Sequence, residues 1–267
     1  MKKIFTLFAT LLFAVTAMAE DYECNLAVFA YGTPSDYQKV NINCTKNANE
    51  KFDFLLKNFS FGTMNVGDIN VKDIDVIEQN GDFYRFKTKQ TIKIMFVVPC
   101  EIELEGTLNG STLDVKLLIP SFSTSVLVNN NPKLETYPQV TGLKVFGTDV
   151  PNFDPSKNTG NSIVLPTTPT DADITFTTDD ASAKTYVLSF HDTENKLFYV
   201  ACYSNDLVGI TNYVFDVVES SGVDAVMEPS CRTVIGRYNV GGKTSGNGSR
   251  GLVITKYSDG TVEKIVK

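Results

Sequence analysis

The sequence contains no tryptophan and only one histidine, His191. One imidazole cannot build a zinc or iron site with several histidine ligands, and no Gly-x-Ser-x-Gly motif supplies the nucleophile of an α/β-hydrolase. The lack of tryptophan removes the largest aromatic face on which a sugar ring could stack. We therefore expect no catalytic residue, no cofactor and no metal ligand, and we interpret His191 as a histidine at the end of a strand.

Basic residues are outnumbered by acidic ones. The 24 lysines and arginines stand against 31 aspartates and glutamates, which gives a formal net charge of −7. Nucleic acids and anionic lipid head groups both require clustered basic side chains in a protein that binds them. We therefore expect neither as a partner.

Two groups of closely spaced aspartates raise the hypothesis of a calcium site, because calcium takes several oxygen ligands. Neither group has the spacing of an EF-hand loop, so we interpret both as solvated acidic turns. The residues are Asp68, Asp73 and Asp75 in the first group, and Asp171, Asp173, Asp179 and Asp180 in the second.

Residues 246–251 formally match the Gly-x-Gly-x-x-Gly fingerprint of dinucleotide-binding proteins. That motif needs a helix after it, because the helix N-terminus holds the pyrophosphate. Residues 252–257 are strand-like, so we interpret the segment as a flexible hairpin loop.

The five cysteines include no Cys-x-x-Cys pair, and their number is odd. If residues 32–36 form a turn centred near Pro34, Cys24 lies directly opposite Cys44 on the next strand, at a separation that a disulfide can span. Two free, buried thiols that behave as small apolar residues are the alternative. The sequence identifies no partner for the other three, Cys100, Cys202 and Cys231.

The chain has one long apolar run, at its N-terminus. Residues 1–19 combine two lysines, an apolar core at 4–15 and a small-x-small cleavage site at 17–19, the three parts of a signal peptide. We expect an exported protein, at the cell surface or secreted, with the periplasm as the alternative. No segment is long enough to span a bilayer after removal of the signal peptide.

Helix-favouring composition is absent, whereas β-branched and aromatic residues are frequent. Between residues 22 and 119, short runs alternate apolar and polar residues and are separated by Gly, Asn and Asp. This period of two is typical of half-buried strands, so we expect an all-β protein. The side chains expected to point inward, and to contact any interior ligand, are Leu26, Val28, Ile42, Phe52, Phe54, Ile92, Ile102 and Leu104.

The pair Asn109-Gly110 predicts a tight hairpin, since both residues accept the positive φ that short loops require. A two-residue loop formed by these residues places Leu104 opposite Val115. Apolar residues then share one face of the hairpin, and local turn chemistry agrees with the wider pattern.

The pair Asn80-Gly81 predicts a second hairpin, but a two-residue loop there would place Val76 opposite Arg85. A shift of one residue moves every side chain to the other face of a strand. We therefore expect burial to select a shifted register, with Val76 opposite Tyr84 and a bulge at Gly81.

The motifs LKNF at 56–59, MNVGDI at 64–69 and QTI at 90–92, with the hairpin at 104–115, resemble the calycin-like β-barrel domain of exported Bacteroidetes proteins. The resemblance covers about residues 22–123. It implies a small antiparallel barrel related in shape to lipocalins, which we place at 20–125, and it adds no catalytic residues. Such a barrel can enclose a small ligand or be filled by its own side chains.

Residues 126–139 lose the alternation and contain the run Asn-Asn-Asn-Pro, which predicts a linker, with 127–128 as an alternative last barrel strand. Several short strands follow over 140–219, as is typical of a β-sandwich. A Phe-Asp-Pro turn before a strand ending in Leu-Pro resembles the bacterial cadherin-like sandwich, although residues 160–162 depart from that pattern. The resemblance implies a spacer or an interaction module.

Residues 220–267 contain hairpin patterns around a Gly/Ser loop and end on Lys267. They resemble the C-terminal sorting domain of the type IX secretion pathway. The resemblance implies contact with the secretion machinery and passage across the outer membrane. A structural hairpin tail in a periplasmic protein is the alternative.

Two functions from different classes fit these observations. The first is a non-enzymatic exported binding protein whose barrel holds a small apolar ligand. The second is a structural or adhesive cell-surface protein with a filled barrel and surface proteins as partners, and a hydrolase ranks third. A void of about 300 Å³ or more lined by Phe52, Phe54 and Ile102 would favour the ligand, whereas a packed interior would favour the structural role.

Overall fold

The computed structural model describes residues 20–61, 64–94, 98–218, 234–239, 243–244, 246, 252–258 and 262–266. These residues form strands and loops, with two short 3-10 helices at Pro120–Phe122 and Asp171–Asp173. The predicted all-β fold class is confirmed. The chain divides into two compact units, Met1–Glu219 and Ser220–Lys267. The predicted signal peptide and Cys231 lie outside the described residues.

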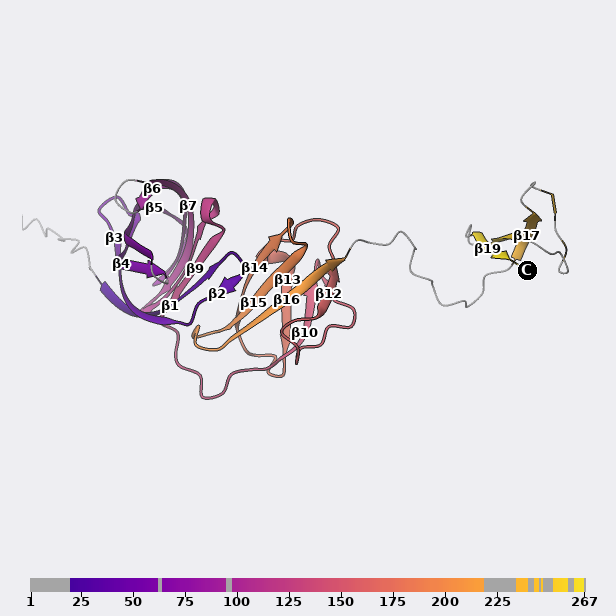
Figure 1. The fold of residues 1–267 in the computed structure, drawn as a ribbon. Helices are drawn as coiled ribbons and strands as arrows, with labels where there is room; N and C mark the ends of the chain where they lie inside the picture. The colour runs from indigo at the N-terminus through magenta and orange to yellow at the C-terminus, as the bar shows by residue number, and fades with distance from the viewer. Residues whose placement is uncertain are drawn as a thin grey trace, which may run out of the picture. The chain divides into compact units, whose positions relative to one another are not determined.

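An eight-stranded antiparallel barrel forms the first part of the first unit (Figure 1). Each strand pairs with the next, and pairing of the first with the last closes the barrel. The closing strand runs to Asn129, past the expected boundary at 125, because it pairs on both of its edges. The strands are β1 (Glu20–Ala30), β3 (Gln38–Lys46), β4 (Phe52–Phe61), β5 (Met64–Asn80), β6 (Phe83–Ile94), β7 (Val98–Asn109), β8 (Thr112–Ile119) and β9 (Thr124–Asn129), with the short β2 (Thr33–Pro34) beside β1.

The first hairpin turns at Tyr31-Gly32 rather than between residues 32 and 36. Both residues have positive φ, 49° and 81°, as the two central residues of a type I′ turn require. The resulting register places Cys24 opposite Val40 instead of Cys44. The predicted alignment of the two cysteines is therefore wrong, although both side chains still point inward, and both are free thiols in this structure.

In both Asn-Gly hairpins the asparagine ends a strand and the glycine opens the two-residue loop. Gly81 and Gly110 have φ of 59° and 56°, and a glycine in the first loop position is characteristic of type II′ turns. Leu104 consequently pairs with Leu117, not with Val115. The predicted partner is wrong, but the predicted inward face is kept because the shift is an even number of residues.

Burial decides the register of the β5–β6 hairpin, as predicted, but through a different irregularity. Val76 pairs with Phe86 rather than with Tyr84 or Arg85. The bulge lies at Ile77, not at Gly81, and Ile77 is exposed. One extra residue in β5 thus returns the apolar side chains to the barrel interior.

Two further sheets lie in the same unit, in the orders β11-β10-β13 and β12-β16-β15-β14. Between them is a second apolar core, to which Leu143, Phe198 and Phe215 contribute. Most strand pairs are antiparallel, but β12 runs parallel to β16. The strands are β10 (Val140–Val145), β11 (Thr148–Asp149), β12 (Asn161–Val164), β13 (Ile174–Thr178), β14 (Thr185–Asp192), β15 (Leu197–Ser204) and β16 (Ile210–Val218).

The second unit contains one antiparallel three-stranded sheet of β17 (Val234–Asn239), β18 (Leu252–Tyr257) and β19 (Val262–Val266). Among the side chains of this sheet that the structure describes, Val253 and Thr255 of the central strand are buried. Most of the glycine motif at 246–251 lies outside the described residues. In the parts of the chain that the structure describes, no helix has the length and apolarity needed to span a membrane.

Candidate functional site

The eight side chains predicted to point into the barrel are all buried, and all belong to one hydrophobic cluster. They come from β1, β3, β4, β6 and β7, so the alternation in sequence identified the inner face of each of these strands correctly. Their role as ligand contacts stays a prediction.

Aromatic rings occupy the barrel interior beside β6 and β7. Phe52 stacks on Phe86 with ring centroids 4.8 Å apart, and Tyr84 meets Phe52 edge-on at 5.5 Å. Gly106 lies under the Phe86 ring, and a Cβ on that glycine would be 2.5 Å from a ring carbon. The space that a side chain at position 106 would need is therefore filled by Phe86.

One stretch of the outer barrel face is also buried. Ala27 and Phe29 of β1 and Leu127 of β9 pack against the β12-β16-β15-β14 sheet. This sheet and the β11-β10-β13 sheet, with the apolar core between them, are called the sandwich from here on. The sequence carries a signal for this burial: residues 26–30 and 126–128 are continuously apolar, as in strands covered on both faces. The sandwich side of this contact consists of Leu188, Ala201, Tyr203 and Leu207.

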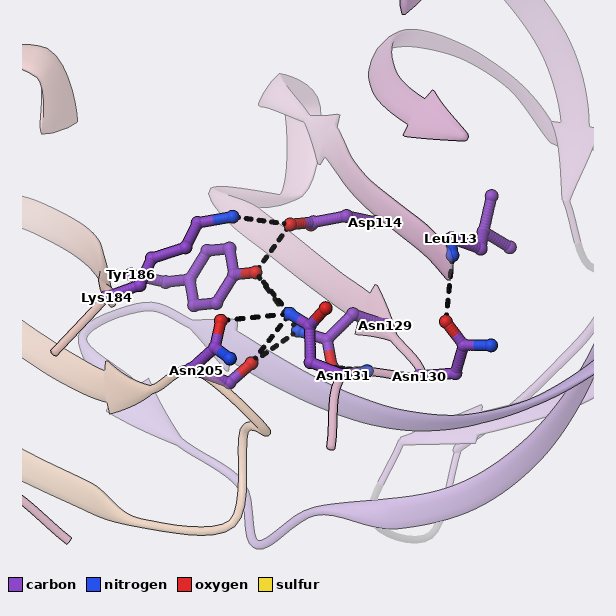
Figure 2. A network of polar contacts seen from close by, with 8 residues as sticks. All are labelled: Leu113, Asp114, Asn129, Asn130, Asn131, Lys184, Tyr186 and Asn205. Atoms are coloured by element: carbon purple, nitrogen blue, oxygen red, sulfur yellow. Dashed lines mark hydrogen bonds and ion pairs between the residues drawn. The ribbon is translucent and has the colours of Figure 1, made fainter. Parts of the chain in front are cut away.

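A polar network surrounds Tyr186 at the edge of this apolar contact (Figure 2). The Tyr186 hydroxyl donates to Asp114 of β8 and accepts from the side-chain amides of Asn129 and Asn131, at 3.3 and 2.9 Å. Both amides also donate to the backbone oxygen of Asn205. Burial, together with the Asp114 carboxylate, raises the pKa of Tyr186, so the hydroxyl stays a donor at neutral pH.

Two ion pairs flank the network. The barrel supplies the acidic residue of one pair and the basic residue of the other. Asp114 of the barrel accepts from Lys184 of the sandwich at 2.9 Å. Lys116 of the barrel donates to Asp171 of the sandwich, and Asp171 also accepts from the backbone and hydroxyl of Ser189, both at 2.7 Å. The Asp171 carboxylate thus binds protein groups at the junction between barrel and sandwich and is not a free ligand for a metal ion.

Asp206 connects three parts of the chain. Its side chain is fully buried and accepts from the backbone N–H of Leu134 in the linker and from Ser204 and Val208 in its own turn. Its backbone oxygen accepts from the Asn25 amide of β1 at 2.6 Å. Asn25 is 7 % exposed, and its Oδ1 has no hydrogen-bond partner among the described residues. The Asn25 amide therefore donates a hydrogen bond to Asp206 while its own oxygen, Oδ1, is buried without a donor, which is destabilising.

These junction residues are not among the predicted site residues. Asn129 and Asn131 fall within the predicted linker at 126–139. Asn25 lies between the inward-pointing Cys24 and Leu26, so alternation alone predicts that it faces solvent. The run of three asparagines directly after an apolar strand was the available signal, since amide side chains supply both donors and acceptors.

Two surface hollows lie away from the barrel core. One, of about 350 Å³, lies on the sandwich beside the exposed side chains of Phe146, Val164 and Val218. The other, of about 440 Å³, is open to solvent beside Lys51 and Asp75. Neither is lined by Phe52, Phe54 or Ile102.

The residues considered for catalysis or metal binding make local structural contacts. His191 contacts Thr168, with Nδ1 and Oγ1 2.9 Å apart, at a half-buried position of β14. Asp173 accepts from Thr170 and closes a capping box at the short helix Asp171–Asp173. Among the residues that the structure describes, no group of His, Cys, Asp and Glu has the arrangement of a metal site.

The barrel segment is similar in sequence to a known family of β-barrel domains. Residues 18–125 match the calycin-like beta-barrel domain. The match ends before the closing strand of the calycin-like barrel does, since β9 continues to Asn129. None of the curated proteins matches the sequence.

A solved structure from Bacteroides fragilis NCTC 9343, named “putative outer membrane protein”, is similar to the chain with a TM-score of 0.32. The two sequences are 10 % identical, and the similarity covers 92 % of this chain and 91 % of that one.

Proposed function

We propose that this protein is an exported, non-enzymatic structural or adhesive protein in which a filled calycin-like barrel and a β-sandwich act as one rigid body. The observation that carries the proposal is the packing of Phe86 between Phe52 and Gly106, which gives the barrel's own side chains the space that a ligand would need. Protein interiors packed in this way hold few voids larger than a water molecule.

The junction supports the rigid-body part of the proposal. Apolar packing of Phe29 and Leu127 is surrounded by the Tyr186 network and by two ion pairs that cross between the domains. Interfaces between mobile domains are usually more polar and lack such a buried apolar centre. A spacer that transmits force or holds a binding surface at a fixed distance needs this kind of junction.

Export is supported by the N-terminal pattern at residues 1–19, and sorting to the cell surface by the pattern at 220–267. The secretion machinery and surface proteins are the partners in this proposal. Protease accessibility on intact cells tests it: degradation of the protein without cell lysis is expected, and complete protection would place the protein in the periplasm.

The alternative in which the barrel holds a small apolar ligand is tested by native mass spectrometry of the mature chain purified from its own source. We expect the mass of the polypeptide alone. A titration with the apolar fluorophore anilinonaphthalene sulfonate accompanies it, on the wild type, Ile102→Phe and Val164→Ser. Ile102→Phe adds volume inside the barrel, whereas Val164→Ser alters only the hollow on the sandwich.

We expect weak fluorophore binding that Val164→Ser reduces and Ile102→Phe leaves unchanged. A retained small molecule, or binding that Ile102→Phe abolishes and Val164→Ser does not, would show that the barrel encloses a ligand and would overturn the filled-barrel proposal.

A further inference from the structure

The two Asn-Gly pairs of the barrel lie in nearly identical surroundings. Asn80 and Asn109 each end a strand, are exposed, and precede a glycine that opens a two-residue loop. The glycines have φ of 59° and 56°, and open space surrounds the Cα of each. The reactivity of the two asparagines can therefore be compared directly within one protein.

The hydrogen bond of the glycine amide differs between them. The N–H of Gly110 donates to the backbone oxygen of Asp82, in the neighbouring turn, at 3.3 Å. The N–H of Gly81 has no such partner among the described residues. The β5–β6 turn thus supplies the acceptor, the Asp82 carbonyl, for the amide of Gly110 in the β7–β8 turn. The amide of Gly81 in the β5–β6 turn itself is open to solvent.

An open glycine amide after asparagine has a specific reactivity. Its nitrogen loses a proton to water and attacks the side-chain carbonyl carbon of the asparagine, a C–N bond forms, and ammonia leaves with a proton taken up from water. Water then opens the five-membered imide at either carbonyl, which gives aspartate or isoaspartate. No oxidation or reduction occurs, and water is the only co-reactant. A glycine permits ring closure because it has no Cβ in the way.

We propose that Asn80 is a site of spontaneous deamidation in the folded protein, and that the hydrogen bond from Gly110 to Asp82 protects Asn109 from the same reaction. Deprotonation of Gly110 must break that hydrogen bond, whereas deprotonation of Gly81 breaks none. The difference should slow reaction at Asn109 by about five- to tenfold, the factor that one hydrogen bond supplies.

Conversion at Asn80 would change the barrel end in two ways. It adds a negative charge close to Asp82, and the isoaspartate product places one more carbon in the main chain at residue 80, where β5 enters the two-residue loop. The contact between the two turns depends on the position of the Asp82 carbonyl, so the product would loosen the protection of Asn109 as well.

The test is peptide mapping by liquid chromatography and mass spectrometry after incubation of the full mature chain at mildly alkaline pH, with isoaspartate measured at both sites. Asn80 is expected to convert about five to ten times faster than Asn109 in the folded protein. In urea, where both glycine amides are solvated, the two sites should convert at similar rates.

An Asp82→Ser variant supplies the matched control, because both turns then read Asn-Gly-Ser while the acceptor carbonyl is retained. Asn80 should still convert faster in the folded variant. Equal rates in the folded wild type, faster conversion at Asn109, or a rate difference that persists in urea would each overturn the proposal.

Discussion

Gly32 lies against the ring of Tyr199, so close that a Cβ on the glycine would be 2.4 Å from the ring carbon Cγ. This contact joins the first barrel turn to the sandwich sheet. Gly32 also has a φ of 81°, which residues with a side chain rarely adopt. A substitution here should therefore be costly for two independent reasons.

We expect Gly32→Ala to lower the free energy of unfolding by about 2–5 kcal/mol, because about 1–2 kcal/mol of backbone strain adds to about 1–3 kcal/mol of overpacking. Gly160→Ala is the control. Gly160 has a φ of 80° with nothing within 4 Å of its Cβ position, so it reports the strain alone. Equal losses in urea denaturation of the two variants would contradict the close contact between Gly32 and Tyr199.

Tyr186→Phe tests the polar network at the junction. The hydroxyl is the donor to Asp114 and an acceptor for the Asn129 and Asn131 amides, so its loss removes one hydrogen bond from each of three partly buried groups. We expect a loss of about 1–3 kcal/mol in the free energy of unfolding. Tyr203→Phe, which removes only a 3.4 Å hydrogen bond to Val28, should cost less. A smaller effect for Tyr186→Phe than for Tyr203→Phe would contradict the role assigned to the network.

Asp206→Ala removes the fully buried carboxylate that holds the linker. The N–H groups of Leu134 and Val208 and the hydroxyl of Ser204 would lose their acceptor. Buried donors without partners are costly, so we expect a loss of about 2–4 kcal/mol by chemical denaturation.

Asp180→Ala is the matched control for Asp206→Ala. The Asp180 carboxylate makes similar local hydrogen bonds, to the backbone and hydroxyl of Ser182, but at an exposed position. Its loss should cost about 0.5 kcal/mol or less. Comparable losses for the two variants would show that burial at the junction adds nothing to the Asp206 contacts.

The thiols of Cys24 and Cys44 should make the barrel less stable in alkali. Burial raises the pKa of each from 9.0 to about 12. Between these values the unfolded chain releases the thiol proton and the folded chain does not. The stability contribution is thus complete below about pH 9 and is lost as the pH rises towards 12, by up to about 1.4 kcal/mol per pH unit and thiol.

Denaturation at pH 8 and at pH 10 measures this effect, with Cys24→Val as the control that removes one of the two thiols. The variant should lose less stability than the wild type between the two pH values. Native protein should also resist thiol alkylation at Cys24 and Cys44 until it unfolds. Rapid alkylation of either residue in the native protein would contradict their burial.

Alternation along the strands was sufficient to determine the inner face of the barrel. Leu26, Ile42 and Ile102 are buried as predicted, because the period of two is a property of extended backbone and needs no knowledge of the partner strand. The strand registers of the hairpins were not predicted correctly. Each predicted hairpin partner was displaced by an even number of residues, which keeps the same face inward while changing the neighbour.

The turn positions depended on single backbone angles. Tyr31 adopts a positive φ that its residue type does not favour, and this moved the first turn and separated Cys24 from Cys44. At Gly81 and Gly110 the glycine took the first loop position instead of the second. The residue types limit which positions can form the turn, but the packing of the two strands selects one of these positions.

An all-β chain and the inward side chains could be predicted from the sequence, because both follow from the local periodicity and composition of successive strands. The barrel itself was predicted from the resemblance of residues 22–123 to a known family. Tertiary packing, in contrast, covers Ala27 and Phe29 on the outer barrel face, brings Asn25 to Asp206, and brings the Asn129 and Asn131 amides to Tyr186. Asn25 and Asp206 are separated by 181 positions along the chain. Their contact depends on how two finished domains fit together, and no local pattern of residues encodes that fit.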